Sequence, residues 1–240
     1  MRTWALSAGL SLVVGGSTAL TTGCSAVEVD PYVVPLDELS ESQKEKVLHV
    51  LADVAAVVPL EPADVKSRVE IYHFLLDEMP FTGGIVRELG RGKWQITRDA
   101  RDPAAFLVVD PEGYRLRFEL IRKEEHRRIY VTRGVFQMGL LPPLEGSTVI
   151  IMRMAPAGGV VKTDAVVYVR VETPFYAQLA KGVRGLLEDR VRERSGVFIK
   201  AARWVAEEAV ARPDWLVMQV DGSHEVDQAV LQEFRKRFLR

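Results

Sequence analysis

The chain has 240 residues, of which 48% are hydrophobic and 27% charged, and its formal net charge is −1. This near-neutral balance argues against the strongly basic surface of a nucleic-acid-binding protein, so no nucleic-acid partner is expected. A single cysteine excludes an internal disulfide, and the fold therefore depends on its hydrophobic core. The length fits one domain with extensions.

The first 23 residues have the layout of a secretory signal peptide. One positive charge, Arg2, precedes an apolar run over residues 5–20, and small residues follow before the lone Cys24. The run is shorter than the about 20 residues that cross a bilayer. Its length and flanks favour a cleaved export signal over a membrane span.

Leu20-Thr21-Thr22-Gly23-Cys24 resembles the lipobox of bacterial lipoproteins, although Thr21 stands where that family usually has leucine. The resemblance implies that Cys24 carries a lipid and becomes the mature N-terminus. It further implies an exported protein of the cell envelope, anchored to the cell membrane or outer membrane and facing the periplasm or exterior. Cleavage after Ala26 and an uncleaved anchor are the alternatives.

The next part of the chain predicts a tether followed by helices. Prolines punctuate residues 24–40, which favours an extended tether. Apolar residues recur at helical spacing over about 41–58 and again over 63–78, so two helices are expected. Pro80 is expected to end the second helix, and Gly83-Gly84 to turn the chain.

From Lys93 onward apolar residues no longer recur at helical spacing but at every second position. This alternation, with short turn sequences between the segments, predicts at least six strands in an antiparallel meander. In the last strand, Val167, Val169 and Val171 are expected on one face and Tyr168 and Arg170 on the other. The expected strands lie at about 94–97, 105–109, 116–120, 129–136, 149–154 and 160–172.

Thr173-Pro174 opens the longest helical stretch, which is expected to run to about Arg212. Basic residues on its other sides alternate with acids, which predicts a solvated, salt-bridged surface. Residues 213–240 are expected to form a C-terminal extension with a short strand over 215–220 and a helix capped by Ser223. The apolar stripe consists of Phe175, Leu179, Val183, Leu187, Val191, Phe198, Ala202 and Val205.

The order of these elements resembles the helix-grip fold of the START and polyketide-cyclase-like lipid-binding superfamily. The likeness covers about residues 64–212 and is strongest where strand 165–171 passes through Thr173-Pro174 into the helix ending at 201–207. It implies an α+β fold, in which an antiparallel sheet wraps around a long C-terminal helix, with helices at the N-terminus. The expected helix-grip domain is 41–212, although a first strand is not obvious unless Tyr32–Val34 supplies it.

The same resemblance implies an apolar cavity between sheet and helix that binds a lipid or hydrophobic small molecule without chemistry. The alternative is a structural or interaction lipoprotein with a solid core and an unknown protein partner; a cyclase- or hydrolase-type enzyme is a third hypothesis. The aromatic, methionine and leucine residues that are candidates for lining the cavity are Trp94, Phe106, Phe118, Met152, Met154, Phe175, Leu179, Leu186 and Phe198.

No catalytic residue, cofactor or metal site is predicted. The four histidines are not at zinc-ligand spacing, and the chain lacks a nucleophile elbow, a phosphate loop and a dinucleotide fingerprint. Arg133, Arg153 and Arg170 stand at polar strand positions and are expected to point outward.

Overall fold

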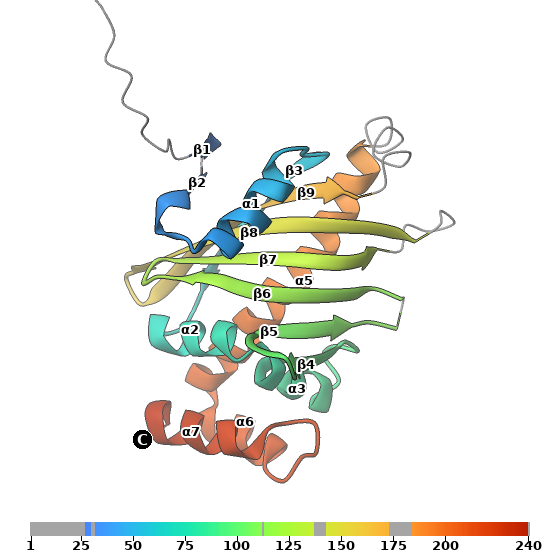
Figure 1. The fold of residues 1–240 in the computed structure, drawn as a ribbon. Helices are drawn as coiled ribbons and strands as arrows, with labels where there is room; N and C mark the ends of the chain where they lie inside the picture. The colour runs from blue at the N-terminus through green and yellow to red at the C-terminus, as the bar shows by residue number, and fades with distance from the viewer. Residues whose placement is uncertain (1–26, 30–31, 112, 137–142, 173–183, 240) are drawn as a thin grey trace, which may run out of the picture.

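A seven-stranded antiparallel sheet forms the middle of the molecule, with helices on both of its faces (Figure 1). The computed structural model describes residues 27–29, 32–111, 113–136, 143–172 and 184–239. Strands β4 to β9 follow one another in the sheet as they do in sequence, and β3 pairs with β9 at the edge. The strands are β3 (Ala56–Val65), β4 (Gln95–Asp99), β5 (Asp102–Val109), β6 (Arg115–Lys123), β7 (Arg127–Phe136), β8 (Leu144–Ala157) and β9 (Val160–Val171).

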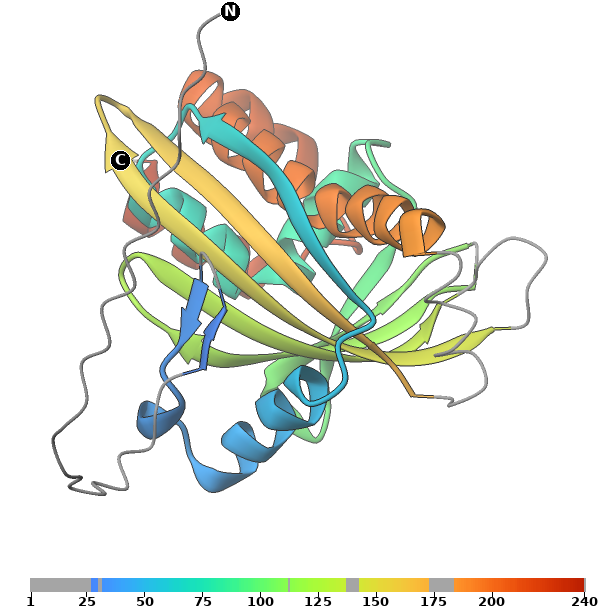
Figure 2. The same ribbon diagram turned by 90° about the horizontal axis from the view of Figure 1, so that it is seen from above.

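Helices cover the two faces unequally (Figure 2). The face packed against α5 (Arg184–Ala211), α2 (Val69–Asp77) and α3 (Met79–Glu88) is the α5 face, and the one packed against α1 (Glu41–Leu51) is the α1 face. This is the expected α+β helix-grip arrangement. The remaining elements are β1 (Val27–Val29), β2 (Tyr32–Val34), the single turn η1 (Leu36–Glu38), α6 (Pro213–Val220) and α7 (Gln228–Phe238).

Alternation along the strands gives each face of the sheet its own hydrophobic core. On β9, Val167 and Val169 pack toward α5, whereas Val166 and Tyr168 belong to the core on the α1 face. Because successive side chains of a strand point to opposite faces, both faces must be covered to keep these residues from water. The expected meander and the alternation of its last strand are confirmed.

The first strand of the sheet lies where the sequence predicts the end of a helix. Helix α1 ends at Leu51, and residues 56–65 form β3. Pro59 and Pro62 have no N–H to donate, and β3 tolerates them because it is an edge strand paired only with β9. Strand β3 therefore supplies the missing first strand, whereas Tyr32–Val34 pairs only with β1.

Pro80 and the Gly83-Gly84 pair lie inside helix α3 instead of between elements. Pro80 occupies the first turn, where a missing N–H leaves no helical hydrogen bond unmade. A Cβ atom on Gly84 would lie 2.1 Å from the backbone oxygen of Glu225, and one on Gly83 would lie 2.8 Å from Cδ1 of Ile96. The two glycines therefore serve the close packing of α3 and not a turn.

The stretch expected as a tether is partly inside the domain. Val34, Leu36 and Leu39 are buried in the core on the α1 face. Burial of these side chains explains why the chain follows the sheet here despite its prolines. Residues 24–26 and the expected helix start at 173–183 lie outside the described residues.

The C-terminal extension differs from its prediction. Residues 213–220 form helix α6 instead of a strand, because their apolar side chains recur at helical spacing and are buried. The cap of α7 is Asp227, whose side chain accepts two backbone N–H groups, and not Ser223. Within the described parts of the chain, no helix is both long and apolar enough to span a bilayer.

Replacing Gly84 by alanine should lower the free energy of unfolding by about 1–3 kcal/mol, because the new methyl group overlaps a backbone oxygen. Replacing Gly196 by alanine should raise the free energy of unfolding by up to about 1 kcal/mol, since alanine favours the helix and the added Cβ atom would lie in open space. Urea unfolding of the parent and of both variants shows whether each substitution lowers or raises the free energy of unfolding. A Gly84→Ala protein as stable as the parent would contradict the close approach of α3 to residue 225.

Candidate ligand-binding site

Three phenylalanine rings occupy the middle of the gap between α5 and the sheet. Phe106 and Phe118 lie directly opposite each other on β5 and β6, with ring centroids 5.1 Å apart. Phe198 of α5 stacks on both rings, at centroid distances of 5.6 and 5.1 Å and interplanar angles of 10° and 3°. Such contacts stabilise by about 0.5–1.5 kcal/mol each beyond burial, so they hold the helix against the sheet.

Tyr130 of β7 meets this stack edge-on. Its ring centroid lies 6.4 Å from that of Phe106 and 6.3 Å from that of Phe198. The hydroxyl donates a hydrogen bond of 3.3 Å to the backbone oxygen of Leu76 on α2. Burial raises the pKa of Tyr130 far above its usual value, so the ring stays neutral and the middle of the gap is uncharged.

Two small pockets flank the stack along α5, each with a volume of about 50 Å³. The Thr132 pocket lies between Thr132 of the sheet and Val191 of the helix. The Val108 pocket lies between Val108 of β5 and Val197 of α5. Leu116 and Phe118 line both pockets, which are therefore neighbours.

A third pocket, the Trp204 pocket, continues this series toward the surface. Its volume is about 280 Å³, and it shares Trp94 and Val197 with the Val108 pocket. The exposed Arg91 places its guanidinium 5.4 Å from the centre of the Trp204 ring. The three pockets therefore follow one side of α5 from the interior to the solvent beside Trp94.

One ion pair faces the two inner pockets. Arg194 of α5 donates a hydrogen bond of 3.0 Å to Asp110, and its guanidinium lies 4.5 Å from the centre of the Tyr114 ring. The side chains of Arg194 and Asp110 are only 19% and 6% exposed. Arg194 and Tyr114 line both the Thr132 and the Val108 pockets, so an apolar ligand in either pocket would meet the guanidinium of Arg194.

The structure divides the predicted cavity residues into three groups. Those that line the pockets are Trp94, Phe118 and Phe198, with Phe106 packed beside them in the stack. Those that belong to the packed core and line none of the three pockets are Met152 and Met154. Those outside the described residues are Phe175, Leu179 and the side chain of Leu186, together with the predicted lipid-attachment residue Cys24.

Sequence reasoning missed Arg194 and Asp110. The apolar stripe of the long helix passes from Val191 to Phe198, and Arg194 stands on the same side within this interval. A charged residue inside an apolar stripe indicates a buried partner, which was the available signal. Nothing in the sequence indicates that Arg194 pairs with Asp110, which is 84 positions away. Asp110 belongs to the turn sequence that follows a predicted strand.

The salt bridges expected along α5 are present. Arg190 lies 2.9 Å from Glu193, and Arg192 lies 2.8 Å from Asp189. Among the residues that the structure describes, no three His, Cys, Asp or Glu side chains are grouped so that they could hold a metal ion. What distinguishes the gap is a mostly apolar lining that includes the ion pair of Arg194 with Asp110.

No protein-family model and no curated protein matches this sequence. Among solved structures, Ara h 8.0201 is 15% identical with a TM-score of 0.41, over 63% of this chain and 98% of its own. A truncated norcoclaurine synthase from Thalictrum flavum is 12% identical with a TM-score of 0.38, over 65% and 94%. The di-domain ARO/CYC BexL is 11% identical with a TM-score of 0.44, over 67% and 53%. The fold assignment rests on this chain's own strand order and helix placement.

Replacing Arg194 by methionine, or Asp110 by asparagine, should each lower the free energy of unfolding by about 1–3 kcal/mol, because the remaining side chain loses this charged hydrogen bond at a mostly buried place. The double variant should lose clearly less than the sum of the two, since the same hydrogen bond is lost only once. Urea unfolding of the parent, the two single variants and the double variant gives the interaction free energy between the two side chains. Strictly additive losses would show that the two side chains do not interact.

Proposed function

We propose that this protein is a lipid-anchored envelope protein that binds a small hydrophobic molecule or lipid in the gap between α5 and the sheet, without chemistry. The observation that supports the proposal is the series of three adjoining pockets along α5. Sites for small molecules are mostly apolar with a few placed polar groups, and here Arg194 is such a group. It would bind the polar end of the ligand, while the pockets hold its apolar part.

The size of the pockets limits how such a ligand is held. The Thr132 and Val108 pockets, at about 50 Å³ each, are far smaller than the roughly 300–1,000 Å³ of ordinary ligand sites. Phe198 is the one ring of the stack that comes from the helix, and it is half-buried. We infer that a ligand enters beside Trp94 and displaces Phe198, replacing its stacking contacts with its own.

The phenylalanine stack also supports the alternative, a structural or interaction protein with a filled interior. In that case the two inner pockets are packing defects, which protein cores contain in small numbers. The two functions differ in one measurable property. Only a binding protein takes up an apolar probe into the space beside α5.

Replacing Val191 by phenylalanine should fill the Thr132 pocket and weaken binding of the neutral fluorophore N-phenylnaphthylamine by about tenfold or more, equivalent to about 1.4 kcal/mol. Val210, which is 48% exposed on the same helix, offers the matched control Val210→Phe, for which binding should not change. Fluorescence titration measures the affinities, and native mass spectrometry detects any lipid that copurifies. A parent protein that carries no lipid and binds no fluorophore would favour the filled-interior function.

The anchor is proposed from Cys24 and its preceding residues alone. Cells that express the protein and take up a palmitate analogue should label the parent, and Cys24→Ala should abolish the label because the acceptor thiol is gone. The same variant should move from the membrane fraction to the soluble fraction, whereas Ser25→Ala should not. If the parent itself is unlabelled and soluble, the lipoprotein proposal is wrong.

A further inference from the structure

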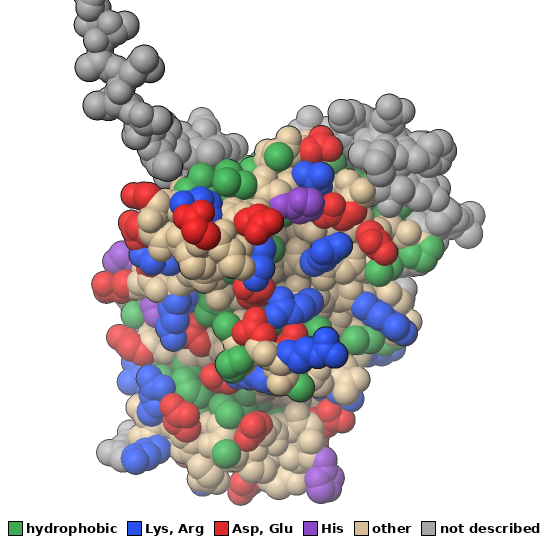
Figure 3. Space-filling view, in the orientation of Figure 1, with side chains coloured by type: hydrophobic (Ala, Val, Ile, Leu, Met, Phe, Trp, Pro, Cys, Tyr) green, Lys and Arg blue, Asp and Glu red, His purple; other side chains and the backbone are tan. Residues whose placement is uncertain are grey.

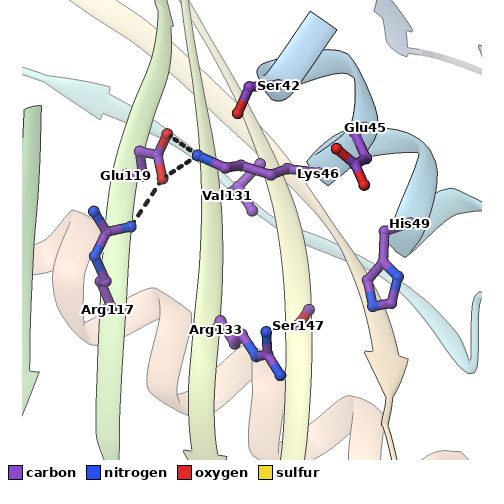
Figure 4. Close-up of a pocket in the computed structure, with 9 residues that line it drawn as sticks. All are labelled: Ser42, Glu45, Lys46, His49, Arg117, Glu119, Val131, Arg133 and Ser147. Carbon is purple, nitrogen blue, oxygen red and sulfur yellow. Dashed lines mark hydrogen bonds and ion pairs between the residues drawn. The ribbon is translucent and has the colours of Figure 1, made fainter.

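A pocket of about 500 Å³ lies on the α1 face, on the opposite side of the sheet from the gap (Figure 4). One wall is helix α1, which contributes Lys46 and His49. The floor is formed by Val131 and Arg133 of β7 and Ser147 of β8. This volume falls within the roughly 300–1,000 Å³ of small-molecule sites.

Helix α1 is firmly attached, so this pocket is a fixed part of the domain. Ser40 and Gln43 form a capping box at its start, and the Gln43 side chain also donates a hydrogen bond of 3.0 Å to the backbone oxygen of Ile121 on the sheet. Val47 and Val50 on its inner side are fully buried. A cap of this kind stabilises a helix by about 1 kcal/mol.

Three arginines stand in one row across the α1 face of the sheet, and two of them, Arg117 and Arg133, line the pocket. Arg117 of β6 is directly opposite Arg133 of β7, Arg133 is opposite Ser147 of β8, and Ser147 is opposite Arg170 of β9. All three arginines lie on the α1 face, as was expected for Arg133 and Arg170. On this side of the molecule Lys and Arg side chains are interspersed with Asp and Glu side chains (Figure 3). Like charges directly opposite each other on a sheet are unfavourable, so each arginine needs a negative partner.

Two of the three have such partners. Arg170 lies 3.4 Å from Glu172 and donates a hydrogen bond of 2.5 Å to the backbone oxygen of His49. Arg117 is held by three carboxylates at 2.6–2.8 Å, those of Asp99, Asp102 and Glu119.

Arg133, between them, forms no hydrogen bond or ion pair with any of the residues that the structure describes. It is exposed, and its side chain lies in the pocket (Figure 4).

The two acids of this pocket, Glu119 and Glu45, do not pair with Arg133. Glu119 accepts hydrogen bonds of 2.7 and 2.9 Å from Lys46 as well as one from Arg117. Burial tends to raise the pKa of Glu119, but these bonds outweigh it and hold the pKa below its usual value. Glu45, the other acid of the pocket, is exposed, where water screens its charge.

Glu172 lies outside the lining of the pocket and binds two of the lining residues. Its carboxylate accepts a hydrogen bond of 2.6 Å from the Ser147 hydroxyl and pairs with His49 at 3.0 Å. Burial again tends to raise its pKa, but these bonds and the charge of Arg170 lower it overall. The carboxylate stays ionised at neutral pH and is held by its own partners, so it is not a partner of Arg133.

We propose that this pocket binds an oxyanion group, a phosphate or a carboxylate, of a small organic molecule. Arg133 is the residue that binds this negatively charged group. A guanidinium binds both kinds of group through two parallel hydrogen bonds. Val131, beside it on the floor, offers an apolar surface for the body of the molecule. The site lies on the other face of the sheet and does not depend on a ligand in the α5 gap.

The test is calorimetric titration with inorganic phosphate and with glycerol phosphate. Arg133→Gln should weaken binding about 10- to 100-fold, the effect of losing a hydrogen bond between charged groups. Arg153→Gln is the matched control, because Arg153 lies exposed on the neighbouring strand, is paired with Asp164 and does not line the pocket. Its affinity should equal that of the parent.

Thermal unfolding separates loss of the site from loss of the fold. Because Arg133 is exposed and faces Arg117, the Arg133→Gln protein should unfold at the same temperature as the parent or higher. Glycerol phosphate should raise the unfolding temperature of the parent but not that of the variant, since a ligand stabilises only the state that binds it.

Vesicles distinguish a soluble ligand from a lipid headgroup. The measurement is cosedimentation of the protein with phosphatidylcholine vesicles that contain phosphatidylglycerol. If the parent cosediments and the Arg133→Gln variant does not, the oxyanion belongs to a membrane lipid. Binding of glycerol phosphate without vesicle binding would assign it to a soluble molecule. The proposal is overturned if the parent binds none of these probes, or if Arg133→Gln binds them as well as the parent does.

Discussion

Burial of both faces of one sheet is the constraint on which the rest of this structure depends. Strands such as β9 place apolar side chains on both sides in turn, so neither face can be left to water. Helix α5 with α2 and α3 covers one face, and α1 with the chain before it covers the other. On each face, the helices leave space next to part of the sheet. Each of the two candidate sites lies in such a space.

The two sites differ in chemistry because neighbouring residues of one strand point in opposite directions. Thr132 lines the apolar pocket under α5, whereas Arg133, next to it on β7, lies in the polar pocket under α1. The Thr132 hydroxyl pairs with that of Thr148 at 2.7 Å, so neither hydroxyl is left without a hydrogen bond on the apolar side. Only the thickness of the sheet separates a surface suited to hydrocarbon from one suited to a charged group.

The sequence was most informative where structure is local. Period-two alternation predicted six strands, and the apolar stripe predicted α5, because each pattern is repeated within its own element. Strand β3 was missed because its prolines are tolerated only at a sheet edge, a position that a local pattern does not reveal. Helix α6 was missed for a related reason, since its eight residues are too few to separate a helix from a strand by period.

The sites were less predictable than the fold because they depend on pairs distant in sequence. The outward direction of Arg133 followed from alternation, but the pocket around it needs α1, whose Lys46 meets Glu119 from 73 positions away. The apolar gap was expected from the helix-grip likeness, yet the charged pair of Arg194 and Asp110 within it was not. Which arginine lacks a partner depends on strand register, which a single sequence does not define.

The prolines of β3 affect how readily the protein aggregates when many copies are close together. An exposed sheet edge is a template on which another chain can add a strand, which leads to aggregation. Here one rim has Pro59, Pro62 and a register slip between Leu60 and Ala63, and the other ends in the five-residue strand β4. Both rims are therefore poor templates for intermolecular strand addition, so copies at high local density are expected to remain separate along their sheet edges.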